Sequence, residues 1–235
     1  MKTTNRLTTK SAYPIAAFLL ALLLNAPATA GVVTTYDSAI AFNSAISGLD
    51  STVCDFESSS AGDVIASGDS LCNMTFDYDL GGLPLTINDD FDTVSGNNYL
   101  GVDGGEFFLG DSFDITFGQS INAFGLFIIT TIADVFPDDF TIANANGSAN
   151  SNLSVQDTLP DGGEVLFLGI HDTDGFNSIS FSTYTGCNGC VLFDIDDITY
   201  ASATAVPSPA SSTLFLLGFL ALGVIRKRNA RQQSS

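Results

Sequence analysis

Carboxylates are the most frequent reactive side chains in this sequence, and two groups of them have a spacing that suits cation binding. Asp55 and Glu57 are two residues apart, so an extended strand would present both on one side. In residues 191–200 the alternation of apolar residues changes parity at Asp196 and Asp197, where a β-bulge would restore it and redirect one carboxylate. If the first and last strands are neighbours, these acids converge. Oxygen ligands of this kind suit a hard cation such as calcium.

The charges are strongly segregated along the chain. All 26 acidic residues lie between residues 31 and 205, and this segment contains no Lys or Arg. The seven basic residues lie in the two tails: Lys2, Arg6, Lys10, Arg226, Lys227, Arg228 and Arg231. Because a polyanionic surface is repelled by the phosphate backbone, nucleic acid is excluded as a partner. Self-repulsion also opposes compaction, which predicts stabilisation by calcium, by a saline medium, or by both.

Two short patterns raise the possibility of other chemistry. Residues 67–71 read SGDSL, which is similar to the nucleophile block of GDSL hydrolases, but the single histidine, His171, lacks the Asp three residues before it that those enzymes need. A serine without a positioned base is a weak nucleophile. Residues 172–177 read DTDGFN, similar to the start of an EF-hand loop but without its closing Glu, and are interpreted as a turn. We therefore predict no enzymatic activity.

Residues 1–30 have the organisation of a secretory signal peptide. A basic start is followed by the apolar run AAFLLALLL and by small residues that end at Ala30, which predicts cleavage before Gly31. An N-terminal membrane anchor is the alternative. The apolar run is shorter than the roughly 20 residues that a membrane-spanning helix requires.

Three consecutive segments end the chain: a linker at residues 202–209, an apolar run at residues 210–225 and a basic tail at residues 226–235. We predict a transmembrane helix in the apolar run. As a helix it would extend about 24 Å against a hydrocarbon core of about 30 Å, so it can insert with strain. The basic residues behind it should stay on the cytoplasmic side, which leaves the acidic body outside.

This ending, VPSPASSTLFLLGFLALGVIRKR, resembles the PEP-CTERM sorting signal, which combines a Pro-x-Pro motif, a short transmembrane helix and a basic cluster. The matching residues are Pro207 and Pro209, with Ser208 where Glu is usual, and then Arg226, Lys227 and Arg228. The resemblance implies processing near the motif by an exosortase, a membrane transpeptidase-like protease, after signal peptidase has acted at Gly31. It also implies a Gram-negative bacterium, transient anchoring in the inner membrane, and delivery to the cell envelope, cell surface or extracellular matrix. A plain C-terminal anchor is the alternative.

An exported protein can keep disulfides, so we expect its four cysteines to be paired. Cys54, Cys72, Cys187 and Cys190 allow three disulfide pairings. We favour the pairing of near neighbours, Cys54 with Cys72 and Cys187 with Cys190. A zinc site is the alternative, but one Cys-x-x-Cys with two widely spaced cysteines lacks the usual doubled motif.

The body between the two signals is the size of one domain. Its first part, residues 31–49, carries Ala39, Phe42, Ile46 and Leu49 at helical spacing, which predicts one short amphipathic helix as a lead-in.

The signal changes to a period of two in residues 50–201. Phe113, Ile115 and Phe117 alternate with polar residues, as expected for a half-buried strand. The segments AFGLFIIT, EVLFLGI, FNSISFST and VLFDIDDITY follow, separated by Gly, Asn and Asp that predict turns. The pattern predicts an all-β fold, a jelly-roll-like antiparallel β-sandwich with one short N-terminal helix.

The body is also similar to domains found ahead of PEP-CTERM signals, on the segments DFE, FLGI, FNSISF and FDIDDITY, and to the galactose-binding-type jelly rolls of carbohydrate-binding modules. In those modules acids of the first and last strands hold a structural calcium ion. The resemblance therefore implies Glu57, Asp196 and Asp197 as candidate calcium ligands. The alternative is that they are solvated acids at strand edges.

Sugar binding would need exposed aromatic rings, and the chain has no Trp. Tyr78, Tyr99 and Tyr184 lie in turn-rich stretches and are the candidates for stacking, with ordinary strand-edge tyrosines as the alternative. We expect an exported, non-enzymatic surface or matrix protein in an exopolysaccharide or biofilm setting. A calcium-dependent carbohydrate-binding module and a secreted hydrolase are the other hypotheses.

Overall fold

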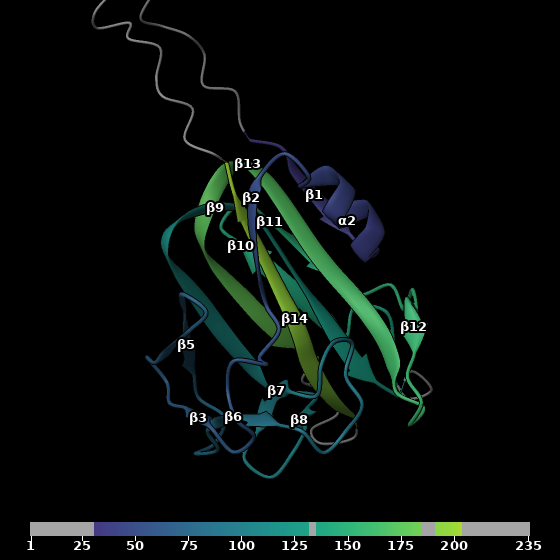
Figure 1. Cartoon of the computed structure of the whole chain (residues 1–235). Helices are drawn as coiled ribbons and strands as arrows, with labels where there is room; N and C mark the ends of the chain where they lie inside the picture. Colours follow the sequence, from purple (N-terminus) through teal and green to yellow (C-terminus); the bar gives the residue numbers. More distant parts are fainter. Residues whose placement is uncertain (1–30, 132–134, 185–190, 204–235) are drawn as a thin grey trace, which may run out of the picture.

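The computed structural model describes residues 31–131, 135–184 and 191–203. Within these residues the protein is an all-β fold of antiparallel strands with one helix, α2 (Ala39–Ala45), as Figure 1 shows. In chain order the strands are β1 (Val33–Tyr36), β2 (Asp50–Cys54), β3 (Val64–Ile65), β4 (Ser70–Leu71), β5 (Met74–Tyr78), β6 (Leu85–Asn88), β7 (Tyr99–Val102), β8 (Phe107–Phe108), β9 (Ser112–Thr130), β10 (Phe140–Asn144), β11 (Gly147–Asn150), β12 (Asp157–Thr158), β13 (Glu164–Thr183) and β14 (Leu192–Ser202).

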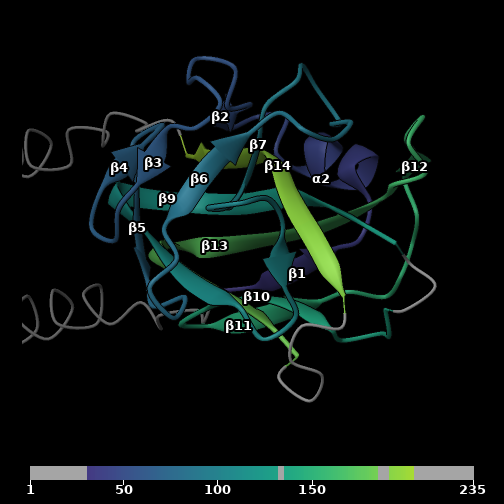
Figure 2. The same ribbon diagram turned by 90° about the horizontal axis from the view of Figure 1, so that it is seen from below.

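Two long strands, β9 and β13, are the centre of the fold. They pair antiparallel along most of their length, with register shifts around Phe176. On one side of the shifts β5 and β10 flank the pair, and on the other side β14 and β1 flank it. The pair of β9 and β13 is thus shared by two groups of strands, which gives a β-sandwich-like arrangement. In Figure 2, β9 and β13 run between β6 and β7 above and β10 and β11 below.

The turns expected near residues 118–122 and 172–175 are absent, and this prediction was wrong. The chain does not reverse at either place. It continues as one strand, β9 or β13, through an irregular segment in which Gly175 has a φ of 76°. Gly, Asn and Asp relax the backbone here into a bend and bulge, a role that local sequence does not distinguish from a turn.

The alternation that predicted a half-buried strand is confirmed. Phe113, Ile115 and Phe117 are all buried in β9. Phe113 stacks between Phe107 and Phe181, with ring centroids 5.9 and 5.0 Å apart. Aromatic rings thus form much of the core between the two groups of strands.

The predicted helix is also confirmed. Ser38 caps it by accepting a hydrogen bond from the backbone of Ala41, and Phe42 is its buried residue. The ring of Phe42 packs on Phe167 of β13 at 5.2 Å. The segment expected as a purely helical lead-in also contains β1, which pairs with β13 and so belongs to the sheet.

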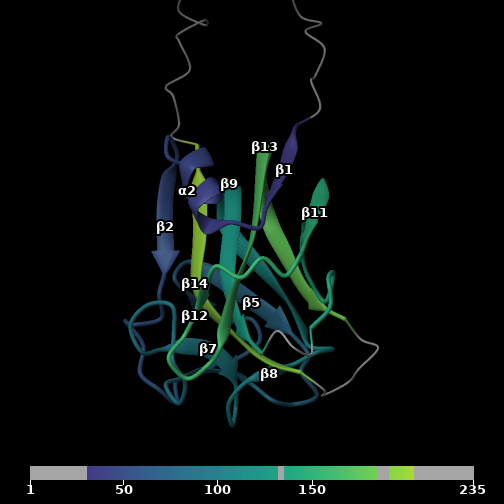
Figure 3. The same cartoon turned by 90° about the vertical axis from the view of Figure 1, so that its right-hand side faces the viewer.

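The two ends of the described chain lie at the same end of the fold, as Figures 1 and 3 show. The backbone of Gly31 donates to the carboxylate of Asp174, at 2.7 Å. Ala203 donates to the side chain of Asn122 at 2.9 Å, and Asn122 donates to the carbonyl of Asp172 at 3.1 Å. Both ends are therefore fixed to the same short stretch of β13.

The predicted signal peptide, the Pro-x-Pro motif, the apolar run at residues 210–225 and the basic tail all lie outside the described residues. Among the residues that are described, no helix is long and apolar enough to cross a membrane.

Candidate functional site

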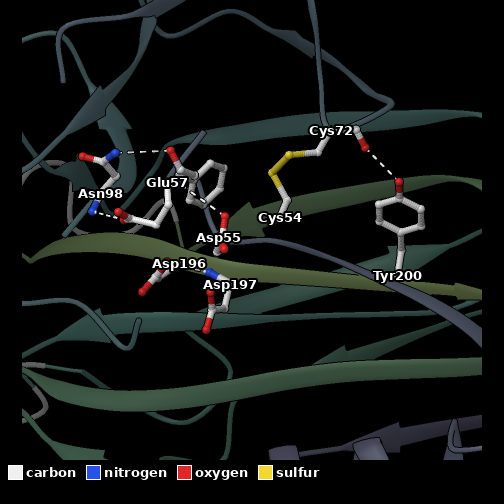
Figure 4. The surroundings of a disulfide bond; sticks show 9 residues. Cys54, Asp55, Glu57, Cys72, Asn98, Asp196, Asp197 and Tyr200 are labelled. Carbon is white, nitrogen blue, oxygen red and sulfur yellow. Dashed lines mark hydrogen bonds between the residues drawn. A yellow bond between two sulfur atoms is a disulfide. The ribbon is translucent and has the colours of Figure 1, made fainter. Parts of the chain in front are cut away.

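The site predicted from the sequence is organised by β14, which pairs with β2 on one side and with β9 on the other. The first and last strands of the predicted sandwich are therefore direct neighbours, as the convergence of Asp55 and Glu57 with Asp196 and Asp197 requires. Figure 4 shows these four acids on one side of a disulfide and Tyr200 on the other.

The disulfide joins Cys54 at the end of β2 to Cys72, and this predicted pairing is confirmed. Cys72 and Asn73 form the two-residue turn between β4 and β5, and both have positive φ angles, 51° and 62°. Such a turn matches the twist of a tight hairpin. The carbonyl of Cys72 accepts a hydrogen bond from the Tyr200 hydroxyl at 2.8 Å, so the turn is held to both β2 and β14. The second predicted disulfide, between Cys187 and Cys190, lies outside the described residues.

The predicted β-bulge in the last strand is confirmed. Between Asp196 and Thr199, β14 advances three residues while its partner β9 advances two, from Phe127 to Gly125. Asp197 takes up the extra residue with a φ of 44°. Apolar residues on both sides of the bulge, such as Ile195 and Ile198, therefore face the core despite their opposite parity.

Asp196 and Asp197 bind the loop between β6 and β7. One carboxylate oxygen of Asp196 accepts from the backbone N–H groups of Val94 and Ser95, at 2.8 and 3.1 Å. Its other oxygen accepts from the N–H of Asp197 at 2.7 Å. Asp197 in turn accepts from the Ser95 hydroxyl at 2.6 Å.

Glu57 holds the next part of the same loop. Its Oε1 accepts from the backbone N–H groups of Asn97 and Asn98, at 2.8 and 2.7 Å. Asp55 lies beside it and accepts from the N–H of Glu57 at 3.2 Å. We call Asp55, Glu57, Asp196 and Asp197 the acid clamp, because three of the four hold the loop of residues 94–98 and the fourth orients the turn that carries Glu57.

In the acid clamp, the charged form of Glu57 is stabilised, whereas the charged forms of Asp196 and Asp197 are destabilised. The N–H groups of Asn97 and Asn98 lower the pKa of Glu57. Burial and, after it, the neighbouring charge of Asp197 raise the pKa of Asp196 to about 7, against the lowering effect of the backbone N–H groups that its carboxylate accepts. Burial also raises the pKa of Asp197, opposed by the Ser95 hydrogen bond and aided by the charges of Asp55 and Glu57.

The geometry bears on the calcium prediction in two ways. The acids come together as expected, but several of their oxygens are already occupied by backbone N–H groups. No three His, Cys, Asp or Glu side chains among the described residues are grouped so as to hold a metal ion. Calcium binding by Glu57, Asp196 and Asp197 stays a prediction.

A buried pair of polar groups near the acid clamp was missed by sequence reasoning. Asp194 and Tyr99 are almost fully buried, and neither Asp194 Oδ1 nor the Tyr99 hydroxyl has a hydrogen-bond partner among the described residues. Burial, together with the charges of Glu106, Asp161 and Asp196, raises the pKa of Asp194 to about 8. By parity Asp194 lies opposite Phe193 and Ile195, so the sequence pattern assigned it to solvent.

The three candidate tyrosines do not form the expected stacking surface. Tyr99 is fully buried, so its ring has no free face, and this part of the prediction was wrong. Tyr78 is half-buried and its hydroxyl bridges the carbonyl of Ile65 and the N–H of Leu85, which makes it a brace between strands. Tyr184 is exposed.

The arrangement expected of a serine hydrolase is not formed by Ser70 and His171. The Ser70 hydroxyl lies 2.7 Å from that of Thr75, its partner across the β4–β5 hairpin. His171 lies in β13, paired with Thr34 of β1 and Ala123 of β9. The segment DTDGFN is part of β13, and not the turn that was expected.

No protein-family model matches the chain, and no curated protein matches it significantly.

Proposed function

We propose that this chain is an exported, non-enzymatic protein of the cell surface or extracellular matrix, sorted by a PEP-CTERM/exosortase system in a Gram-negative bacterium. The setting is exopolysaccharide or biofilm matrix. Signal peptidase and exosortase are its partners during processing, and polysaccharide is its partner afterwards. The resemblance of the two chain ends to sorting signals supplies the setting.

The observation that carries export is the disulfide between Cys54 and Cys72. Disulfides persist in the periplasm and outside the cell but are rare in a reducing cytoplasm. The first and last described residues, Gly31 and Ala203, both lie near Asp172–Asp174, which also supports the proposal. Both sorting segments would leave the body at one end, and the loops at the opposite end would face away from the membrane.

The jelly-roll topology is part of the same proposal. The strand order β11-β10-β13-β9-β14-β7-β6-β3 is antiparallel at every pairing, and strands distant in sequence are neighbours in it, as in β9 and β14. Such crossovers between two groups of strands are the mark of jelly rolls and related sandwiches.

Intact-mass analysis of the protein purified from its own cells tests the proposal. We expect a mature chain that begins at Gly31 and ends near Pro207–Pro209, because both sorting segments are removed. A chain that ends at Ser235 in cells that contain an exosortase would overturn the sorting proposal. The matched control is Pro207→Ala with Pro209→Ala, which should retain the C-terminal segment while the N-terminus is still cut at Gly31.

A calcium-dependent carbohydrate-binding module is the second candidate. The observation that favours it is the gathering of the acid clamp at one loop, in a body without Lys or Arg to neutralise it.

A further inference from the structure

A groove of about 520 Å³ opens beside the disulfide. Its lining comes from β2, the β4–β5 hairpin, the middle of β9 and the end of β14, and consists of Thr52, Ser70, Asn73, Thr75, Phe117, Gly118, Gln119, Ile121 and Tyr200. We call it the neutral groove, because none of these residues is charged. Its volume lies within the usual range for small-molecule sites, about 300–1,000 Å³.

The absence of charge from this lining is a feature of the site, since the body around it carries 26 acids. By contrast, a cavity of about 420 Å³ near the acid clamp is lined by Asp89, Asp90, Asp92 and Asp161. A cation attracted by the protein would bind there, and would find no carboxylate in the neutral groove. An anion would be repelled by the net charge of −19.

The neutral groove presents hydrogen-bonding groups that the described protein leaves unused. The side-chain amides of Asn73 and Gln119 and the hydroxyl of Thr52 make no hydrogen bond to any other described residue. These three residues are exposed. The hydroxyls of Ser70 and Thr75 bond to each other, which occupies one of their two protons and leaves the other to donate.

The floor of the groove is aromatic and rigid. The rings of Phe117 and Tyr200 pack with centroids 5.3 Å apart, and each residue is 7% exposed. The Tyr200 hydroxyl is fixed by its hydrogen bond to Cys72, whose turn is fixed by the disulfide. The binding groups are thus held on a braced support, which lowers the entropy lost on binding.

An apolar ligand would leave the amides and hydroxyls without partners, at a cost for each buried group. The lining therefore fits an uncharged molecule that carries both hydrogen-bond donors and acceptors. We infer that the neutral groove binds a sugar unit of an uncharged polysaccharide, with Gln119, Asn73 and Thr52 bonding its hydroxyls above Phe117 and Tyr200. This inference rests on the proposed function and assigns it a site and a ligand class.

Titration of the mature, exported protein with three sets of soluble oligosaccharides tests the inference. The probes are neutral oligomers of glucose, galactose, mannose or xylose, acidic oligomers of uronic acids, and cationic oligomers of glucosamine. We expect at least one neutral oligomer to bind in a saturable way, with chemical shifts that change around residues 117–121. Binding of only the acidic or only the cationic oligomers would overturn the inference, and so would binding of none.

Variants then assign the site. Gln119→Ala and Thr52→Val each remove one bonding group at an exposed position, and each should weaken neutral-sugar binding about five- to tenfold. The matched control is Asn97→Ala, which removes an exposed side-chain amide near the acid clamp and should leave sugar binding unchanged. Equal binding by the wild type and both groove variants would overturn the inference. If no sugar binds but the mature chain has the expected ends, the neutral groove fails while the proposed function stands.

Discussion

The two halves of β14 differ in chemistry although they belong to one strand. Before the bulge it carries Asp194 and Asp196, which are buried with raised pKa values. After the bulge it carries Tyr200, which forms the floor of the neutral groove. The disulfide lies between the two regions (Figure 4).

In this protein, the polar groups that stabilise the fold and the polar groups that stay available to a ligand lie in different regions. At the acid clamp, the carboxylates have no Lys or Arg as partner and instead accept hydrogen bonds from backbone N–H groups of the loop at residues 94–98. At the neutral groove, the disulfide and the Tyr200 hydroxyl hold the surface, and the side chains of Thr52, Asn73 and Gln119 make no hydrogen bond to other described residues. The acid clamp therefore uses its polar groups to stabilise the fold, whereas the neutral groove keeps some of its polar groups available for a ligand.

The largest expected effect comes from removing the disulfide, which supports both regions. The double variant Cys54→Ala, Cys72→Ala should lose about 3 kcal/mol of unfolding free energy, because a closed loop with a sequence separation of 18 residues restricts the unfolded chain. Denaturant unfolding of the purified protein measures this. Cys187→Ala with Cys190→Ala is the control and should lose less, since the loop it would close is far shorter. Equal losses in the two variants would contradict the assigned role.

Calcium should stabilise the protein through the acid clamp and not through the neutral groove. If the acid clamp binds calcium in the folded state only, a hundredfold excess over Kd raises the unfolding free energy by about 2.7 kcal/mol. Thermal unfolding with calcium, with magnesium and with sodium chloride at matched ionic strength measures the effect.

The double variant Glu57→Gln, Asp197→Asn should abolish the calcium response, while Gln119→Ala should leave it intact. A calcium shift no larger than that of magnesium would show that these acids only hold the loop and screen one another.

A somewhat smaller effect is expected from pH. Burial raises the pKa of Asp194 to about 8, so the folded protein retains a proton that the unfolded chain loses near pH 4. The unfolding free energy should therefore fall as pH rises between about 4 and 8.

Asp194→Asn should reduce that dependence, to which the raised pKa of Asp196 also contributes, and should stabilise the protein by about 2 kcal/mol near pH 8, because it removes a buried carboxylate that ionises only at a cost. Denaturant unfolding across this pH range is the measurement, with the exposed acid Asp103→Asn as control. A variant with the pH dependence of the wild type would show that Asp194 is not the responsible group.

Much of the fold follows from local pattern. Period-two burial at Phe113, Ile115 and Phe117 and helical spacing around Phe42 depend only on which faces meet the core, and both were predicted correctly. The bulge at Asp196–Asp197 was also predictable, because a change of parity within an apolar strand has few other solutions. The near-neighbour pairing of Cys54 with Cys72 was favoured among three possible pairings once export was assumed.

Other features depend on contacts between distant segments. Whether Gly175 and its neighbours form a turn or a bend was decided by β9, whose pairing with β13 continues past them. Asp194 is buried because other parts of the chain cover a face that alternation assigns to solvent. The neutral groove has no signature in any single segment, since its lining comes from four separate parts of the chain.

The sequence alone determined the all-β class, the helix, the bulge and the segregation of charge, because each depends on neighbouring residues and their periodicity. Only the tertiary structure decided which carboxylates hold the loop, which tyrosines are buried and where uncharged polar groups stay unpaired. Those outcomes depend on which strands become neighbours, and local preferences of the chain do not specify strand order.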